Sequence, residues 1–180
     1  SFNGNKIVTT GGGGAVLTND PDLARRVKHL TTTAKKPHAW DYDHDAVGFN
    51  YRLPNINAAI GCAQLERIAG WLREKRLLAE NYRAALRAVP HVESFQEPKR
   101  CRSNYWLNVM LLDSDDMDLR NDILKVLNEA GLMSRPIWIP MHMLEMYRDC
   151  PRDDLSVTEK IHRRLISLPS SPRLARADAK

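Results

Sequence analysis

A lysine near the start of the sequence stands where its amine could react with a carbonyl group. Lys6 comes directly before the β-branched residues 7–10, which are typical of a strand, and four glycines follow at residues 11–14. A lysine at the end of a strand can be buried, and a buried amine loses its proton more readily. Such an amine can form a Schiff base with an aldehyde cofactor. Most lysines are solvated surface residues, so Lys6 needs a second motif to support this chemistry.

The four glycines at residues 11–14 could suggest a phosphate-binding loop. A P-loop requires Gly-Lys-Ser/Thr before a helix, and the dinucleotide-binding fingerprint also requires a helix after its glycines. Here the residues that follow, 15–18, are Ala-Val-Leu-Thr and are typical of a strand. The helix dipole that favours a bound phosphate is therefore not expected here. The glycines indicate a tight bend that passes close to another group, with a cofactor as one candidate.

Two longer segments carry more specific patterns. The first is Ser1-Phe2-Asn3-Gly4-Asn5-Lys6, followed by Thr9-Thr10, the four glycines and Ala15-Val16-Leu17-Thr18. The second is GFNYRLPNINAAIG at residues 48–61, followed by Gln64-Leu65-Glu66. In order and spacing they resemble the cofactor-lysine segment and the G-x-N-x-R segment of DegT/DnrJ/StrS-type sugar aminotransferases. The resemblance continues to Leu168-Pro169-Ser170-Ser171-Pro172 and so covers the chain.

The resemblance implies a reaction. It implies pyridoxal 5′-phosphate (PLP) as cofactor, glutamate as amino donor and a nucleotide-diphosphate 4-keto-6-deoxy sugar as acceptor, in polysaccharide biosynthesis. Exchange of two substrates at one site would give ping-pong kinetics. Three stretches most resemble the subgroup that serves legionaminic-acid-type sugars, which favours a UDP-linked 2-acetamido sugar. These are Asn3-Gly4-Asn5, Thr31-Thr32-Thr33-Ala34-Lys35 and Arg135-Pro136-Ile137-Trp138.

The resemblance also assigns roles to individual residues. Lys6 would hold the cofactor and, once released, would move a proton between the substrate carbon and the cofactor. Ser1 would bind the cofactor phosphate, and Asn50 would reach the phosphate in the neighbouring subunit of a homodimer with shared active sites. The expected substrate contacts are Arg52, Arg135 and His142. A guanidinium suits carboxylates and diphosphates, whereas a lone histidine such as His142 is more often a structural residue.

Other functions compete with this one. The family's phosphate loop, ring-stacking aromatic residue and pyridine-binding acid lie before the lysine, so we expect residues 1–180 to be inactive alone. Related dehydratases replace the lysine with histidine, and Lys6 disfavours that reaction. A non-catalytic remnant that serves as a dimerisation or binding module is the remaining alternative.

The composition fits a soluble globular protein of the cytoplasm. Hydrophobic residues make up 43% of the chain and charged residues 27%, and no apolar run approaches the roughly 20 residues that span a membrane. The three cysteines, Cys62, Cys101 and Cys150, have no CxxC spacing. A disulfide framework or cysteine zinc site is therefore not expected, and a reducing compartment is.

The charged residues indicate neither nucleic acid nor metal as a ligand. Basic clusters at residues 73–76, 99–102 and 162–164 are predicted to be solvated helix faces and loop tips, because acidic residues are interleaved. The formal net charge of +5 suits an anionic small substrate. Residues 41–45 alternate Asp with other residues, but the glycine and glutamate of a calcium loop are missing.

The first part of the chain is predicted to contain two short strands, a helix, a loop and a long helical stretch. The strands are residues 7–10 and 15–18, and the helix begins at Asn19-Asp20-Pro21 and continues through Leu30. Residues 31–53 are loop-like, and loops of this length are often functional. Pro54 opens the helical stretch, which Gly70 is expected to break and Pro90 to end. One face of this stretch is expected to carry Ile56, Ile60, Ala63, Arg67 and Trp71.

The second part predicts a mixed sheet covered by helices, within an α/β fold. The expected strands are residues 92–95, 104–112 and 134–139, the last at an edge because of Pro136. The expected helices are residues 117–130, closed by Gly131, and about 155–165. With a boundary near Gly70, residues 1–70 would be the C-terminal part of the large domain of a fold-type I aminotransferase. Residues 71–180 would be its small α/β domain, of the β-α-β-β type.

Overall fold

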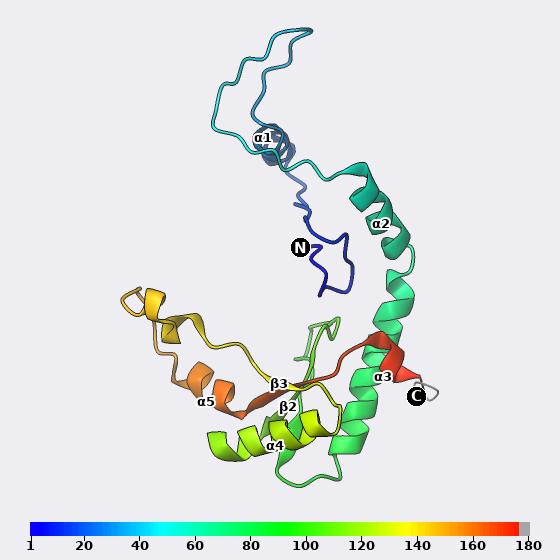
Figure 1. Ribbon diagram of the computed structural model, residues 1–180, viewed down its shortest axis with the longest axis vertical. Helices are drawn as coiled ribbons and strands as arrows, with labels where there is room; N and C mark the ends of the chain where they lie inside the picture. Colours follow the sequence, from blue (N-terminus) through cyan, green and yellow to red (C-terminus); the bar gives the residue numbers. More distant parts are fainter. Residues whose placement is uncertain (177–180) are drawn as a thin grey trace. The chain divides into compact units, whose positions relative to one another are not determined.

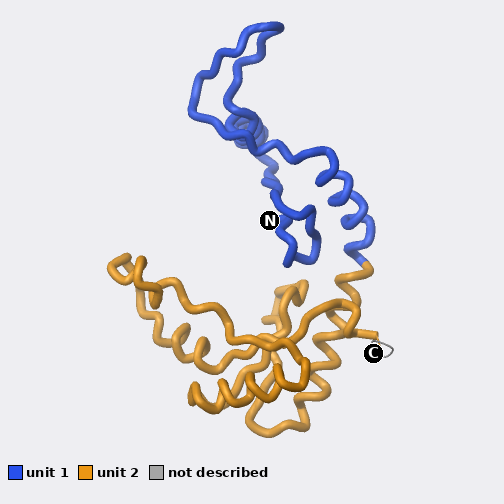
Figure 2. Tube along the Cα trace, in the orientation of Figure 1, with its two compact units in different colours: residues 1–69 blue, residues 70–180 orange. Residues whose placement is uncertain are grey.

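The computed structural model describes residues 1–176 of the 180-residue chain. The chain forms two compact units, residues 1–69 and residues 70–180, which are blue and orange in Figure 2. Within residues 1–176 no helix is long and apolar enough to cross a membrane. The assignment of the two units to a large and a small domain stays a prediction.

Two helices belong to the first unit. Helix α1 (Pro21–Thr31) begins as predicted, because the Asp20 carboxylate accepts hydrogen bonds from the backbone N–H groups of Asp22 and Leu23. Helix α2 (Asn55–Leu65) follows Pro54, whose extended backbone does not continue a helix. Helix α1 follows the first segment that resembles the aminotransferase family, and α2 contains the last part of the second.

The two strands predicted near the start are wrong. Residues 7–10 and 15–18 form no ladder with another strand in the part of the chain that the structure describes. The backbone N–H of Thr9 instead donates to the side chain of Gln64, and that of Thr10 donates to the carbonyl of Phe2. β-branched residues favour extended backbone, but a strand also needs a backbone partner for its hydrogen bonds.

Residues 32–50 form a long excursion, which confirms the predicted loop. Its two arms run antiparallel (Figure 1, cyan), with isolated bridges at Thr32–Asn50 and Lys35–His44. The arms lie close together at Gly48, where an added Cβ atom would be 2.5 Å from the backbone nitrogen of Ala34. Ala34 is fully buried at this crossing, so glycine is needed opposite it.

The helical stretch after Pro54 is interrupted before the predicted position. The break lies at Glu66 and Arg67, and Gly70 is inside helix α3 (Ile68–Leu86). A single glycine in a helix costs only about 1 kcal/mol relative to alanine, so flanking helix formers can override it. Helix α3 ends at Leu86, ahead of Pro90.

The second unit is built on one four-stranded sheet. The strands are β1 (Val92–Ser94), β2 (Asn108–Leu112), β3 (Arg135–Pro136) and β4 (Leu165–Leu168), in the spatial order β1-β2-β4-β3. All three pairings are antiparallel, so the predicted mixed sheet is wrong. Pro136 does lie in an edge strand, as predicted, because it has no N–H to donate to a second neighbour.

Strand β4 was not predicted, although it is central in the sheet. It follows directly on helix α5 (Ser156–Arg164), with no Gly or Asn between them to mark a turn. Leu165–Leu168 is also only four residues long, which leaves too little sequence for a periodic pattern. The order of elements after α3 is therefore β1-β2-α4-β3-α5-β4 rather than the predicted β-α-β-β type.

The core of the second unit lies on one face of this sheet. Met110 and Leu112 of β2 alternate with less buried residues, and Ile166 of β4 is paired with Met110. Directly opposite residues project to the same face, so these side chains form one layer together with Leu168. Side chains of α3 and α4 (Met117–Glu129) cover the layer, namely Tyr82, Leu86, Ile123, Leu124 and Leu127.

Helix α4 ends as its sequence predicts. Gly131 has a φ of +78°, a left-handed conformation that glycine adopts without a steric penalty. The N–H groups of Gly131 and Leu132 donate back to the carbonyls of Asn128 and Leu127, which closes the last turn.

Candidate functional site

The loop that carries Lys6 is closed by its own backbone. The N–H of Phe2 donates to the carbonyl of Gly13 at 2.9 Å, and the N–H of Thr10 donates to the carbonyl of Phe2 at 3.0 Å. Asn3 links both ends of the lysine segment: its N–H donates to the Ser1 hydroxyl at 3.4 Å, and its carbonyl accepts from the Lys6 N–H at 3.0 Å. The Lys6 side chain is half-buried, and it belongs to the same closed loop as Ser1.

One face of helix α2 holds this loop. The N–H of Thr9 donates to Oε1 of Gln64 at 2.8 Å, and Nδ2 of Asn57 donates to the carbonyl of Thr10 at 2.5 Å. Thr10 is 1% exposed and lies against Gly61, where an added Cβ atom would be 3.0 Å from its Cγ2. The helix thus presents two polar side chains and a glycine to the loop.

Sequence reasoning missed this face of α2. It predicted an apolar face with Ile56 and Ile60, but these side chains are 78% and 44% exposed. The signal that could have found it is the spacing of Asn57, Gly61 and Gln64, at four and three residues, which places them on one side of a helix.

The glycine run forms the tight bend that the sequence predicted. Gly11 and Gly13 have φ values of +80° and +89°, in the left-handed region that favours glycine. An added Cβ atom at Gly13 would lie 2.9 Å from Cδ1 of Leu53, so the bend passes close to the segment before α2. Inside the bend, the Thr10 hydroxyl donates to the carbonyl of Gly12.

Ser1 and Arg52 line one pocket, while Lys6 and Asn50 are not among its lining residues. The pocket has a volume of about 910 Å³ and lies within the first unit. Its lining is largely apolar and includes Val16. The structure therefore brings Ser1 together with Arg52 in the pocket and with Lys6 in the closed loop, while Asn50 belongs to neither group.

Asn50 and Arg52 are held beside the end of α1. Asn50 pairs with Thr32 in an isolated bridge, and the N–H of Tyr51 donates to the carbonyl of Thr31 at 2.9 Å. Arg52 donates from Nη2 to the carbonyl of Thr32 at 3.5 Å. Both predicted site side chains are exposed, and their backbone is anchored to the C-terminal turn of the helix.

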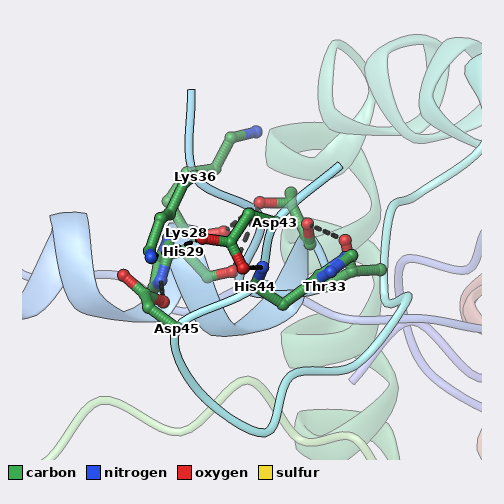
Figure 3. A network of polar contacts seen from close by, with 8 residues as sticks. Lys28, His29, Thr33, Lys36, Asp43, His44 and Asp45 are labelled. Atoms are coloured by element: carbon green, nitrogen blue, oxygen red, sulfur yellow. Dashed lines mark hydrogen bonds and ion pairs between the residues drawn. The ribbon is translucent and has the colours of Figure 1, made fainter. Parts of the chain in front are cut away.

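One charged pair joins the excursion to α1, and a second pair lies within the excursion itself. Nε2 of His29 lies 2.5 Å from a carboxylate oxygen of Asp45, and Nζ of Lys36 lies 2.6 Å from a carboxylate oxygen of Asp43. Figure 3 draws these residues. The hydrogen bond with His29 lowers the pKa of Asp45, and the one with Lys36 lowers the pKa of Asp43. These pairs are exposed, so each stabilises the excursion only weakly.

The two predicted substrate residues of the second unit, Arg135 and His142, have different contacts. Arg135 is exposed, and its guanidinium lies 5.3 Å from the ring centre of Trp138, which stacks on Trp106. His142 places Nε2 at 3.0 Å from a carboxylate oxygen of Glu159. Arg135 remains a candidate for anion binding, whereas His142 already has a partner in the chain.

Two residues of the basic cluster at 73–76 have partners within the fold, which corrects the prediction of a solvated face: Lys75 is buried, and the Arg76 side chain is 30% exposed. Lys75 is 3% exposed and donates from Nζ to the carbonyl of Ser170 at 2.6 Å, and burial lowers its pKa. Arg76 donates to both carboxylate oxygens of Glu97 and to the carbonyl of Ser103. The hydrogen bond from Arg76, with another from the Ser103 N–H, lowers the pKa of Glu97 to about 2.

The donor groups of the first unit fit a phosphorylated aldehyde. Lys6 offers the amine that an aldehyde requires. The Ser1 hydroxyl and the Asn50 amide are neutral donors of the kind that bind phosphate oxygens.

Comparison with known proteins shows what this chain is similar to. The DegT/DnrJ/EryC1/StrS aminotransferase family matches residues 1–180. A putative pyridoxal phosphate-dependent aminotransferase of Bacillus subtilis, EpsN, is 35% identical over 97% of this chain and 45% of its own length. GDP-perosamine synthase of Caulobacter vibrioides is 36% identical over 99% of this chain and 48% of its own length. The chain thus spans about half the length of the curated relatives it matches.

Solved structures share the fold. PseC of Helicobacter pylori, an aminotransferase involved in pseudoaminic acid biosynthesis, superposes with a TM-score of 0.87 at 24% identity, over 96% of this chain and 47% of its own. The PLP form of the sugar aminotransferase Spr1654 of Streptococcus pneumoniae superposes with a TM-score of 0.80 at 19% identity, over 95% and 45% of the two chains. The described residues therefore form part of a fold-type I α/β structure.

Proposed function

The chain belongs to the DegT/DnrJ/EryC1/StrS aminotransferase family, and we propose that the protein of which it is part transfers an amino group to a nucleotide-linked keto sugar. PLP is the cofactor of this family. The observation that carries the proposal is the closed loop that presents Lys6 next to Ser1. Because residues 1–180 span about half of the related proteins, we expect activity from the whole protein and none from these residues alone.

Lys6, Ser1 and Asn50 would hold the cofactor. PLP, when bound, supplies an electron sink for the substrate carbon that carries the amino group. Nζ of Lys6 would bind the aldehyde carbon and, after release, would take a proton from that substrate carbon. The Ser1 hydroxyl would donate to the phosphate, and the amide of Asn50 would do so in a second copy of the chain.

We further propose a UDP-linked 2-acetamido-4-keto-6-deoxy sugar as acceptor and glutamate as donor, as in legionaminic-acid-type biosynthesis. Arg52 and Arg135 carry exposed guanidinium groups that suit a diphosphate, and His142 lies on the same unit as Arg135. The net charge of +5 favours an anionic substrate. Relatives act on other nucleotides, as the name GDP-perosamine synthase indicates, so the UDP sugar is the narrowest part of the proposal.

The exposed aromatic side chains of the excursion support a homodimer. Trp40 and Tyr42 near its tip are 80% and 76% exposed, and Phe49 and Tyr51 stack on each other at 5.2 Å. Large aromatic side chains are enriched in protein–protein interfaces. A second copy packed on this excursion would receive Asn50 close to its cofactor. The three exposed thiols are best kept reduced, which supports a cytoplasmic location.

Reduction and peptide mapping test the proposal directly. The full-length protein is incubated with PLP, reduced with borohydride and digested, and the peptides are analysed by mass spectrometry. We expect a pyridoxyl group on Lys6 and none on Lys125, an exposed lysine of α4 that serves as the internal control. Absence of the label from Lys6 in a folded, cofactor-saturated protein would leave the chain as a binding or assembly module.

A further inference from the structure

Helix α2 contains the end of the second motif, and it also binds the loop that carries Lys6. Its contacts reach the two peptide groups that flank the Thr9–Thr10 peptide bond: Gln64 holds the N–H of Thr9, and Asn57 holds the carbonyl of Thr10. Both contacts join residues that are far apart in the sequence, 55 and 47 positions respectively.

The two side chains take the place of a neighbouring strand. Residues 7–10 form no ladder with another strand in residues 1–176, so their backbone groups need other partners. Gln64 supplies a hydrogen-bond acceptor and Asn57 a donor, and a paired strand would supply the same two kinds of group from its backbone. With one hydrogen bond on each side of the Thr9–Thr10 peptide bond, sliding or rotation of the loop on the helix would break at least one of them.

Gly61 allows this close approach. It lies four residues after Asn57 and three before Gln64, so all three occupy one side of α2. Thr10 packs against it and is almost fully buried. An added Cβ atom would lie 3.0 Å from Cγ2 of Thr10, which would press the loop away from the helix by a few tenths of an ångström.

The same helix also begins at the segment that carries Asn50 and Arg52. Pro54, two residues after Arg52, accepts the first helical hydrogen bond from Ala58. Leu53 lies so close to Gly13 of the lysine loop that an added Cβ atom there would be 2.9 Å away. Helix α2 and the residue before Pro54 therefore connect the two motifs within one unit.

We propose that Asn57 and Gln64 are positioning residues that hold the loop of Lys6 in the conformation in which its amine meets the cofactor, with Gly61 as the contact that admits the loop. The inference rests on the proposed role of Lys6. Neither side chain touches the reacting atoms, so both act through the backbone at Thr9 and Thr10. Their loss should alter the reactivity of Lys6 while the amine itself remains.

The first experiment needs no cofactor. Hydrogen–deuterium exchange is measured on the cofactor-free, full-length protein and its Gln64→Ala and Asn57→Leu variants. Loss of one hydrogen bond should speed exchange of the peptide that contains Thr9 and Thr10 by about three- to tenfold. Gln64→Glu keeps an acceptor oxygen and should restore slow exchange near neutral pH. Asn55→Ala, an exposed asparagine of the same helix, should change nothing in that peptide.

The second experiment measures the reactivity of Lys6 toward the cofactor. The rate at which PLP and borohydride label Lys6, and the absorbance spectrum of the bound cofactor, are compared for the same variants. We expect slower labelling and a shifted spectrum for Gln64→Ala and Asn57→Leu, with recovery in Gln64→Glu. Exchange in α1 and the thermal midpoint report whether a variant is folded, and Gly61→Ala, which removes no hydrogen bond, provides an independent displacement of the loop.

The outcomes separate the two proposals. No label on Lys6 of the unmodified protein overturns the proposed function, while the exchange data still decide whether α2 holds the loop. Normal labelling and an unchanged spectrum in folded Gln64→Ala and Asn57→Leu variants overturn the positioning role and leave the aminotransferase intact. Unchanged exchange at Thr9 and Thr10 in both variants overturns the contact itself.

Discussion

Gln64 accepts a hydrogen bond at 2.8 Å from the backbone N–H of Thr9, a residue 55 positions earlier in the chain. This bond joins the segment of Lys6 to the helix that follows Asn50 and Arg52. The two motifs that resemble the aminotransferase family are therefore physically connected, although residues 19–47, which include helix α1, separate them in sequence.

Replacement of Lys6 should abolish transamination without unfolding the protein. Lys6→Ala removes the amine that would hold the cofactor and move the proton, and loss of such a group lowers rates by about 10²- to 10⁴-fold. The measurement is the turnover of the full-length enzyme with glutamate and a keto sugar nucleotide. Lys125→Ala, at an exposed position of α4, is the control and should retain full activity. Equal activity of the two variants would exclude Lys6 from catalysis.

Gly48 should not tolerate a side chain. In Gly48→Ala the new methyl group would lie 2.5 Å from the backbone nitrogen of Ala34, and both arms of the excursion would have to separate. We expect a loss of roughly 1–3 kcal/mol in the free energy of unfolding, measured by urea denaturation. The matched control is Gly4→Ala, since nothing lies within 4 Å of the added atom there. Equal stability of both variants would mean that the arms do not cross at Gly48.

Gly70 should accept alanine. It lies inside α3, and the nearest atom to an added Cβ is the flexible end of Arg73 at 3.8 Å. Alanine loses less backbone entropy than glycine in a helix, so Gly70→Ala should stabilise the protein by about 0.5–1 kcal/mol in thermal or urea unfolding. A marked destabilisation would instead support the break that the sequence suggested at this residue.

The pair Arg76–Glu97 should make stability depend on acidic pH. The pKa of Glu97 is lowered from 4.5 to about 2, chiefly by the hydrogen bond from Arg76. A carboxylate whose pKa is lowered in the folded state stabilises that state above its unfolded pKa. The stabilisation should therefore be complete at pH values above 4.5, and it should disappear as the pH falls toward 2.

Substitution of Glu97 tests this dependence. Glu97→Gln should lower stability at neutral pH and flatten the pH profile of the unfolding free energy in the acidic window. Glu129→Gln, at the exposed end of α4, controls for the loss of one negative charge. Identical profiles of the Glu97→Gln variant and the unmodified protein would show that the pair does not stabilise the fold.

Local signals in the sequence predicted the beginnings and ends of several elements. Asp20 and Pro21 begin α1, and Gly131 ends α4, because caps and left-handed turns depend on the residues at those positions. Pro136 marked an edge strand for an equally local reason. The resemblance of residues 1–18 and 48–61 to one family also needed no structure, and the family match confirms it.

Other features were decided by contacts between distant residues. Residues 7–10 have the composition of a strand, yet their backbone is bonded to Phe2 and to side chains of α2. Gly70 looked like a helix breaker, but the helix continues through it. Lys75 and Arg76 looked solvated in a basic cluster, and only the folded unit supplies their partners Ser170 and Glu97.

The sequence by itself determined the family, the candidate lysine and the local stops and starts of helices, because each depends on residues a few positions apart. The tertiary structure alone decided that Asn57 and Gln64 hold the loop of Lys6 and that β4 lies at the centre of the sheet. A backbone group must find a hydrogen-bond partner when it leaves water, and that partner can come from any part of the chain. Packing decides which part of the chain provides this partner, and a short stretch of sequence does not contain that information.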